Sequence, residues 1–444
     1  MSSYEERVAS LAQFVGAADD SGIRLSKRTS NLFRDRAPGA RNRLDASAFD
    51  HVIEVNQRDG WVDVEGMVTF EKLVDATLRY GVMPAVVPQL KSITIGGAVA
   101  GVGIEATSFR HGLVHESLLE IDVLLPDGRM LKCSPQNEHR DLFFGFPNSY
   151  GTLGYALRLR ARTIPVKPYV KIVRERFDAP HAFFGAIERT CAGDADFVDG
   201  VVFSPTEMYL NIGRFVDDAP YFSNYTYEHI FYRSIREKPV DFMTAHDYLW
   251  RWDTDWFWCS KNVFAEVPLI RKLYGAKRLN SKTYTQIMRW NSQLGLTRGL
   301  DTLRRMHSES IIQDVDVPIE CASEFFNFHF REIGIAPVWI CPIGSRTASP
   351  GFDLYPMEPR ILYINFGFWD VKRTKARHPP GHFNRLIEQR VMDLGGIKSL
   401  YSDSYFTRNE FSKAYGGDRY RLLKTKYDPE GRFGDLYEKC VLRR

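Results

Sequence analysis

A cluster of glycines near the end of the first quarter of the chain constrains its fold more than any other feature. In residues 91–128, KSITIGGAVAGVGIEATSFRHGLVHESLLEIDVLLPDG, five glycines precede the apolar run that begins at Leu118: Gly96, Gly97, Gly101, Gly103 and Gly112. Glycine is used where the backbone takes positive φ or approaches a ligand closely, because it has no Cβ. The apolar run at residues 118–125 then reads as a buried strand that ends in a Pro-Asp-Gly turn. The stretch predicts backbone folded against a flat, polar cofactor.

Two other motifs fit parts of this stretch. Residues 101–106 match G-x-G-x-x-A, and Asp122 follows at about the 20-residue spacing of a dinucleotide-binding fingerprint. Residues 106–112 lack the helical apolar stripe that this fingerprint requires, which argues against it. Residues 97–101 match G-x-x-x-G, but the surrounding apolar run is far shorter than the roughly 18 residues of a membrane span. We therefore reject a membrane helix here.

Composition narrows the classes of protein further. The 444 residues predict two or three domains, and a net charge of +4 without a basic stripe argues against a nucleic-acid partner. The six cysteines are scattered, with no C-x-x-C pair, which predicts reduced thiols and no metal site. The first 20 residues lack the features of a signal peptide. The chain is expected in the cytoplasm, without a membrane anchor.

Beyond these motifs, the chain resembles a known family. Residues 92–128 and the turn at 151–154, GTLG, resemble the flavin-binding half of the vanillyl-alcohol-oxidase-like (PCMH-type) FAD family. Within it, the likeness is to the 24-dehydrocholesterol (Delta(24)-sterol) reductases and their plant and bacterial relatives. It continues through four later blocks, at residues 311–314, 337–342, 362–365 and 400–405. The order of these blocks is more specific than any single motif.

The resemblance implies an α+β fold. We expect a PCMH-type FAD-binding domain of two α/β subdomains at residues 1–166, with Pro165 and Pro168 marking a hinge. A substrate-binding cap domain with an antiparallel sheet flanked by helices is expected at residues 167–395. Residues 396–444 are expected to return to the FAD domain.

Sequence patterns predict the individual elements. Apolar spacing predicts helices at residues 4–18, 70–80 (with Thr69 as N-cap), 141–146, 182–190 and 382–394. Alternation and turn signals predict strands at residues 51–56, 61–65, 83–87, 155–165, 201–204, 208–212, 336–340 and 360–367.

The resemblance also implies which residues bind FAD. These are Thr29, Ser30, Asn31, Thr94, Ile95, Gly96, Gly97, Gly101, Gly103, Ile104, Ser108, Gly151, Thr152 and Gly154. The first three stand where the family has a pyrophosphate loop, although the usual glycines are missing and a solvated polar loop is the alternative. Elsewhere in the family a histidine holds the flavin covalently, and His111 and His115 lie near that place. The sterol reductases hold FAD non-covalently, so we expect the same here.

The chemistry must come from a bound cofactor, because no H-E-x-x-H, G-x-S-x-G or Walker motif is present. By resemblance, NADPH reduces the flavin, which then reduces a carbon–carbon double bond in a lipid. The lipid is a sterol side chain or a branched or methylene-bearing fatty acyl chain. The rival functions are an FAD-dependent alcohol oxidase or dehydrogenase and a lipid-binding protein without turnover. The sequence leaves the oligomeric state open.

Reduction of an isolated alkene also requires a proton donor. Residues 400–411 contain Tyr401, Asp403 and Tyr405, which would share one face if this block were a strand. We expect Asp403 to be the acid or a proton relay, with the two tyrosines lining the site; a structural role in a turn is the alternative. Glu320 is the competing acid.

An aromatic tract completes the set of candidate functional features. Residues 250–258 contain five tryptophan or phenylalanine residues, and a basic flank follows at Arg271, Lys272, Lys277 and Arg278. Such a segment is typical of a peripheral membrane contact or the mouth of a lipid pocket. An aromatic core is the alternative. The contact would place the protein at the inner face of the membrane.

Overall fold

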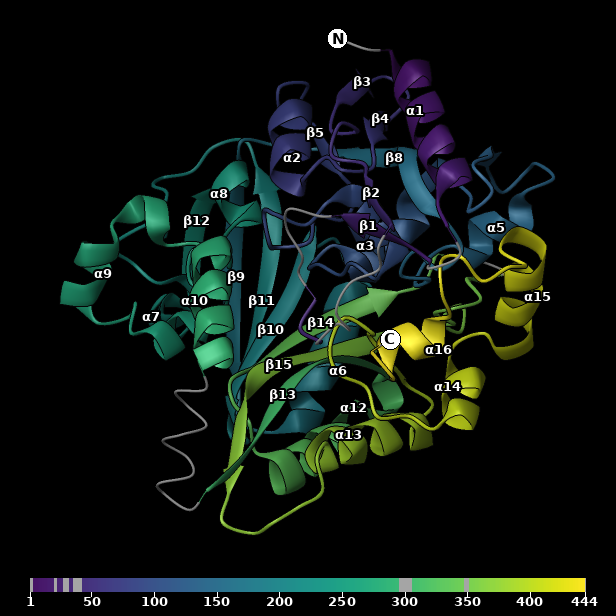
Figure 1. Ribbon diagram of the computed structural model, residues 1–444. Coiled ribbons are helices and arrows are strands. Elements are labelled where there is room, and N and C mark those ends of the chain that lie inside the picture. The colour runs from purple at the N-terminus through teal and green to yellow at the C-terminus, as the bar shows by residue number, and fades with distance from the viewer. Residues whose placement is uncertain are drawn as a thin grey trace.

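The chain folds into two antiparallel sheets with helices packed around them, as Figure 1 shows. This computed structural model describes residues 3–19, 22–26, 32–34, 42–294, 306–346 and 351–443, and of residues 288–294 only the backbone. The predicted α+β class is confirmed.

The first sheet has six strands, in the order β3-β4-β8-β6-β7, with β5 paired to β8. Their bounds are β3 Val52–Asn56, β4 Trp61–Glu65, β5 Val82–Pro84, β6 Leu118–Leu124, β7 Met130–Cys133 and β8 Tyr155–Pro165. Strand β8 alternates between buried Leu157, Leu159 and Ala161 and partly exposed residues. This period of two explains why β8 could be predicted with its observed bounds. A separate parallel pair, β1 Ile23–Ser26 and β2 Asn42–Asp45, lies beside this sheet.

The helices of this half are short, apart from the first. Their bounds are α1 Tyr4–Ala17, α2 Phe70–Leu78, α3 Ile95–Ala100, α4 Ser108–His111, η1 Val114–Ser117 and α5 Arg140–Gly145. The hydroxyl of Thr69 accepts a hydrogen bond from the Lys72 amide, so Thr69 caps α2 as predicted. Phe70, Leu73 and Val74 bury the apolar face of α2. The sequence did not predict α3, because its six residues include two glycines.

The second sheet has eight strands, in the order β12-β9-β11-β10-β14-β15-β13-β16, and each pair is antiparallel. Their bounds are β9 Tyr169–Phe177, β10 Phe197–Ser204, β11 Glu207–Val216, β12 Val240–Thr244, β13 His307–Pro318, β14 Val338–Gly344, β15 Leu362–Thr374 and β16 Ile397–Lys398. Helices α6 Pro180–Cys191, α12 Ile319–Phe328 and α13 His382–Asp393 contribute Phe183, Phe325 and Ile387 to a shared core with these strands.

The remaining helices lie at the two flanks of this sheet (Figure 1). One group, beside β12, comprises α7 Phe231–Glu237, α8 Ala245–Leu249, η2 Cys259–Val263, α9 Pro268–Tyr274, η3 Ala276–Arg278 and α10 Ser281–Leu294. The other, on the opposite flank, comprises α14 Arg408–Ala414, α15 Gly417–Tyr427 and α16 Leu436–Cys440. The single turn η4 His329–Ile333 extends α12. Helix α15 packs on α5, where Lys426 binds Asp141, so the C-terminal segment returns to the first sheet.

The condition attached to the expected proton donor is not met. Residues 400–411 do not form a strand: they run through a turn and an extended segment, and α14 begins at Arg408. Thr407 caps this helix through the Glu410 amide, and the Glu410 carboxylate in turn accepts from the Thr407 amide. This capping box favours a helix start over a continued strand.

Candidate functional site

A cavity of about 330 Å³ lies where the two sheets meet. One wall comes from the glycine stretch and from the turn that precedes β8. The other comes from the segment after α8, from β13, β14 and β15, and from residues 399 and 401. Arg24, Arg34, Lys439 and Arg443 bring positive charge to its lining.

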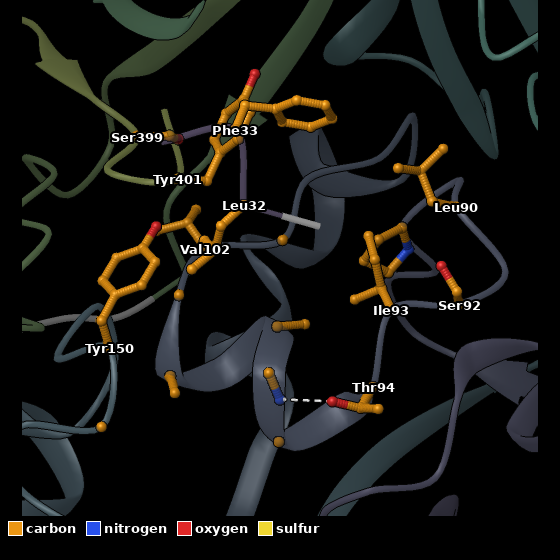
Figure 2. Close-up of a pocket in the computed structure, with 18 of the residues that line it drawn as sticks. Leu32, Phe33, Leu90, Ser92, Ile93, Thr94, Val102, Tyr150, Ser399 and Tyr401 are labelled. Atoms are coloured by element: carbon orange, nitrogen blue, oxygen red, sulfur yellow. Dashed lines mark hydrogen bonds between the residues drawn. The ribbon is translucent and has the colours of Figure 1, made fainter. Parts of the chain in front are cut away.

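The glycine wall is held in shape by local hydrogen bonds. Thr94 caps α3, and its hydroxyl accepts from the Gly97 amide at 3.2 Å, the dashed line in Figure 2. A Cβ on Gly96 would lie 2.7 Å from the carbonyl oxygen of Gly66, so Gly96 is required for α3 to pack on the chain beneath it. A Cβ on Gly103 would lie 2.5 Å from the Val114 side chain. These glycines bring backbone, rather than side chains, to the cavity surface.

The turn that closes this wall has an unusual backbone. Asn148 and Tyr150 adopt positive φ, at 62° and 50°, and Gly151 follows at 78°. Non-glycine residues rarely adopt this conformation, and they do so mostly where the surroundings enforce it. The amide of Tyr150 donates to the carbonyl of Ala100 at 2.7 Å, which fixes the turn to the end of α3. The Tyr150 side chain thereby lines the cavity (Figure 2).

A buried amide in the lining indicates that the cavity is built for a polar ligand. Gln89 is 5% exposed, and neither its side-chain oxygen nor its nitrogen has a hydrogen-bond partner among the described residues. An unsatisfied buried polar group costs roughly 1–3 kcal/mol, so such groups normally have a partner. FAD offers ring carbonyl and N–H groups that match an amide. Gln89 and the backbone of the glycine wall therefore fit this cofactor, and sequence analysis missed Gln89.

A carboxylic acid faces the cavity from β13. The Tyr401 hydroxyl donates to Asp314 Oδ2 at 2.6 Å, and the Trp369 indole N–H donates to the Tyr401 oxygen at 2.8 Å. All three side chains line the cavity. Burial, reinforced by the nearby charge of Asp316, raises the pKa of Asp314 to about 7, although the Tyr401 hydrogen bond opposes the rise. A carboxyl group with this pKa is protonated in a large fraction of molecules at neutral pH.

A second buried acid lies two residues further along the same strand. Asp316 accepts hydrogen bonds from Tyr355 at 2.6 Å and from Asn365 at 2.7 Å. Burial raises its pKa to about 6, with both hydrogen bonds opposing. Asp316 does not line the cavity, but the Tyr355 hydroxyl lies 3.3 Å from that of Ser399, which does. Asp316 thus contributes charge behind the cavity wall.

Aromatic rings share the cavity lining with Asp314. Trp256, Phe257, Trp339 and Trp369 all line the cavity. The Phe257 ring lies 4.5 Å from Trp369 and 5.5 Å from Trp339, centroid to centroid. Both Trp256 and Phe257 have positive φ, which directs the chain sharply into this cluster. Part of the cavity is therefore apolar, and Asp314 is the one acid among the described residues that line it.

The predicted FAD-binding residues divide into three groups. The cavity lining contains Thr94, Gly96, Gly97, Gly101, Gly103, Ile104, Gly151 and Gly154. Three others lie behind it: Ile95 is buried in the core, the Ser108 hydroxyl accepts from the Glu105 amide, and the Thr152 hydroxyl meets Tyr420. Thr29, Ser30 and Asn31 lie outside the described residues, as do Lys27 and Arg28.

The three residues expected around the proton donor lie in different surroundings. Asp403 lies outside the cavity lining and pairs with Arg443 at 3.1 Å. Tyr405 also lies outside it, with its amide bonded to Glu388. The shared face depended on a strand that does not form, so of the three only Tyr401 reaches the cavity. Glu320 is exposed at the start of α12 and does not line the cavity.

Neither histidine considered for covalent attachment lines the cavity. His115 is buried against Phe352, 4.5 Å between ring centroids, and burial lowers its pKa to about 3. His111 lies beside Arg346, and burial together with that charge lowers its pKa to about 4. The expectation of non-covalent flavin binding stays a prediction.

The aromatic tract is core rather than surface. Trp252 and Trp258 are completely buried and Trp256 is 6% exposed, so the expected membrane contact through these rings is wrong. Arg271 from the basic flank is also buried, in an ion pair with Asp255 at 2.6 Å. Within the described part of the chain, no helix combines the length and the apolar character that a bilayer crossing needs.

Comparison with known proteins identifies the class. Residues 5–134 match a family described as FAD binding domain, so the chain has a PCMH-type FAD-binding domain and is placed among FAD-dependent oxidoreductases. Along most of its length it is similar to Delta(24)-sterol reductases. It is 28% identical to the one from Homo sapiens, over 87% of this chain and 75% of that protein. It is 24% identical to the one from Arabidopsis thaliana, over 89% and 76%.

A more distant relative matches only part of the chain. Cytokinin dehydrogenase 10 of Oryza sativa subsp. japonica is 31% identical over 34% of this chain and 28% of that protein. The predicted resemblance to the FAD family and its sterol reductases is thus confirmed.

Proposed function

We propose that this protein reduces an isolated carbon–carbon double bond in a lipid, with FAD as bound cofactor and NADPH as reductant. The observation that carries the proposal is Asp314, a carboxyl group with a pKa raised to about 7 that faces an aromatic cavity. Similarity to Delta(24)-sterol reductases over most of the chain supports the same reaction class. When bound, FAD supplies the hydride.

The substrate explains why the site needs an acid. An isolated alkene has no carbonyl group to accept the charge that a hydride brings, so one carbon must be protonated as the other receives hydride. We place the proton donor at Asp314 rather than Asp403, because only Asp314 lines the cavity. The rings of Trp339 and Trp369 stabilise positive charge on the neighbouring carbon through their π-faces.

Tyr401 positions the donor. Its hydroxyl holds Asp314 Oδ2 at 2.6 Å, and Trp369 in turn fixes the Tyr401 oxygen. The second carboxylate oxygen, Oδ1, lies over Gly367, where a Cβ would approach it to 2.8 Å. The absence of a side chain at Gly367 leaves room for a proton on this oxygen.

The other wall holds the cofactor. We assign the FAD ring system to Gln89 and to the backbone between Gly101 and Gly103, next to Tyr150. Thr94 and Gly97 shape the start of the wall. The assignment of the diphosphate to Thr29, Ser30 and Asn31 remains a prediction from the family resemblance.

A stopped-flow experiment under nitrogen tests the function. The holoprotein is mixed with NADPH, and flavin bleaching is followed; the reduced protein is then mixed with a sterol or a phospholipid that carries an alkene. Bleaching by NADPH and recovery of flavin colour by either lipid supports the proposal and identifies the lipid class. Bleaching by an alcohol instead of NADPH would support an oxidase or dehydrogenase, and no bleaching with either would support a lipid-binding protein.

A further inference from the structure

A surface at one edge of the molecule combines exposed apolar and basic side chains. Its apolar members are Phe264, Val267, Leu269 and Leu273, which are 66%, 45%, 70% and 75% exposed. Its basic members are Lys272, Lys277 and Arg278, all exposed. We call these seven residues the α9 surface, since α9 (Pro268–Tyr274) carries its centre and projects at the periphery of the fold in Figure 1.

The fold determines which face of α9 is exposed to solvent. Leu269 and Leu273 are four residues apart on α9, so they lie on one face of the helix. The helix is anchored from the other side by Arg271, which is 4% exposed and binds both Asp255 and the carbonyl of Ala265. A buried ion pair sets which face of α9 points outward, and that face is apolar. Large apolar side chains gathered on an exposed surface mark an interaction site.

The charges on this segment are of one sign. Between residues 264 and 282, Glu266 is the sole acidic residue, and Tyr232 and Arg233 both bind its carboxylate. The exposed charged side chains of the segment are all lysine or arginine. Apolar side chains rimmed by positive charge match the surface of an anionic bilayer, where the rings and leucines enter the boundary and the basic groups meet phosphates.

The α9 surface is also connected to the cavity wall along the chain. Trp256 and Phe257 line the cavity, and the chain reaches Phe264 through the single turn η2. Within that turn, Lys261 binds Asp370, the residue after cavity-lining Trp369, at 3.0 Å. The α9 surface and the aromatic side of the site thus belong to one segment of chain, which is tied to the second sheet by Lys261.

We propose that the α9 surface docks this protein on membranes that contain anionic phospholipid, with Phe264, Leu269 and Leu273 inserted at the bilayer boundary. Docking would bring the enzyme to its lipid substrate, and this role rests on the function proposed above. The binding experiment itself does not require turnover. It replaces the buried aromatic tract as the membrane contact.

Vesicle co-sedimentation of the holoprotein tests the proposal. Vesicles of phosphatidylcholine are compared with vesicles of phosphatidylcholine and phosphatidylglycerol. We expect binding to the mixed vesicles and a loss of about tenfold or more in the Leu269→Glu/Leu273→Glu variant, because both burial and charge attraction are reduced. Lys272→Glu/Lys277→Glu should abolish the preference for the anionic lipid. Flavin content shows that each variant is folded.

Matched controls use similar residues elsewhere. Leu422 on α15 is 70% exposed, as Leu269 is, and Lys413 on α14 is an exposed lysine. Leu422→Glu and Lys413→Glu should leave vesicle binding unchanged. Equal losses in the control and α9 variants, or no binding of the wild-type protein to mixed vesicles, would overturn the proposal. Turnover of the lipid alkene in detergent would still report on the enzymatic function, so the two proposals can fail separately.

Discussion

Replacing Asp314 with asparagine separates proton donation from flavin reduction. The amide keeps the shape of the side chain and accepts the Tyr401 hydrogen bond, but it has no acidic proton. NADPH should therefore bleach the flavin of Asp314→Asn at the wild-type rate. Reoxidation by the lipid alkene should fall by about 10²–10⁴, the usual contribution of a general acid. In the wild-type protein, the same step should slow as pH rises above about 7, because the pKa of Asp314 is raised to about 7.

The same substitution has an effect on stability that does not depend on turnover. The pKa of Asp314 is about 7 in the folded protein against an ordinary 3.8, so the folded state binds a proton in this window that the unfolded state has lost. The free energy of unfolding therefore falls as pH rises through the window, by at most about 4 kcal/mol from this group. Contact of the Asp314 carboxyl group with water in the cavity weakens the effect of burial, so the change in the free energy of unfolding is smaller than this upper bound. Asp314→Asn should lose less stability than the wild type between pH 5 and pH 8.

Two measurements check this reasoning. Stopped-flow spectroscopy gives the two half-reactions as a function of pH, and urea titrations near pH 5 and pH 8 give the stability difference. Tyr401→Phe is the matched control: it retains the acid but removes the hydrogen bond that opposes its raised pKa, so the pH at which reoxidation slows should move upward. Wild-type reoxidation by Asp314→Asn, or identical pH dependence of stability in the two proteins, would refute the assignment.

Three further substitutions test Gln89 in the cavity lining, the missing side chain at Gly367 beside Asp314, and a buried ion pair of Arg251. Gln89→Leu should raise the Kd for FAD by about 5- to 150-fold, the effect of losing a buried hydrogen bond worth roughly 1–3 kcal/mol; unchanged FAD titrations would exclude contact with the flavin. Gly367→Ala should slow alkene reduction with normal flavin content, because its Cβ would lie 2.7 Å from the Trp369 ring. Arg251→Met should destabilise the protein by about 3–5 kcal/mol in urea titrations, since it strands the buried carboxylates of Glu105 and Asp199; an unchanged midpoint would contradict this.

The fold could be predicted largely from local patterns. Helix α2 follows from the spacing of its apolar residues and from Thr69 before it, and β8 from strict alternation. Both signals belong to residues within one element, so a single sequence contains them. The block at residues 400–411 has no such pattern, and the shared face of its three side chains was expected only on the condition that it formed a strand. The packing of α14 and the cap at Thr407 decide its structure instead.

The proton donor could not be located from local patterns, because the pKa of a carboxyl group depends on the residues that surround it in the fold. Asp314 and Asp316 alternate with apolar residues in β13, which is an unusual pattern for a buried strand and was the available signal. The sequence shows neither the burial that raises the pKa of Asp314 nor the Tyr401 hydroxyl beside it. Likewise, the five rings of residues 250–258 and the leucines of α9 are both apolar, yet the former are buried and the latter exposed.

Strand register connects these observations into one site. In the eight-stranded sheet, Gly367 of β15 pairs with Asp314 on one side and with Trp339 on the other. The three residues form a row across neighbouring strands, and the missing side chain at its centre gives space to the Trp369 ring and to Asp314 Oδ1, which would lie 2.7 and 2.8 Å from a Cβ on Gly367. Residues that are far apart in sequence thus reach one surface, opposite the glycine wall. In the proposed reaction, the first sheet and its loops would supply backbone for the cofactor, and the second sheet would supply an acid and π-faces for the alkene.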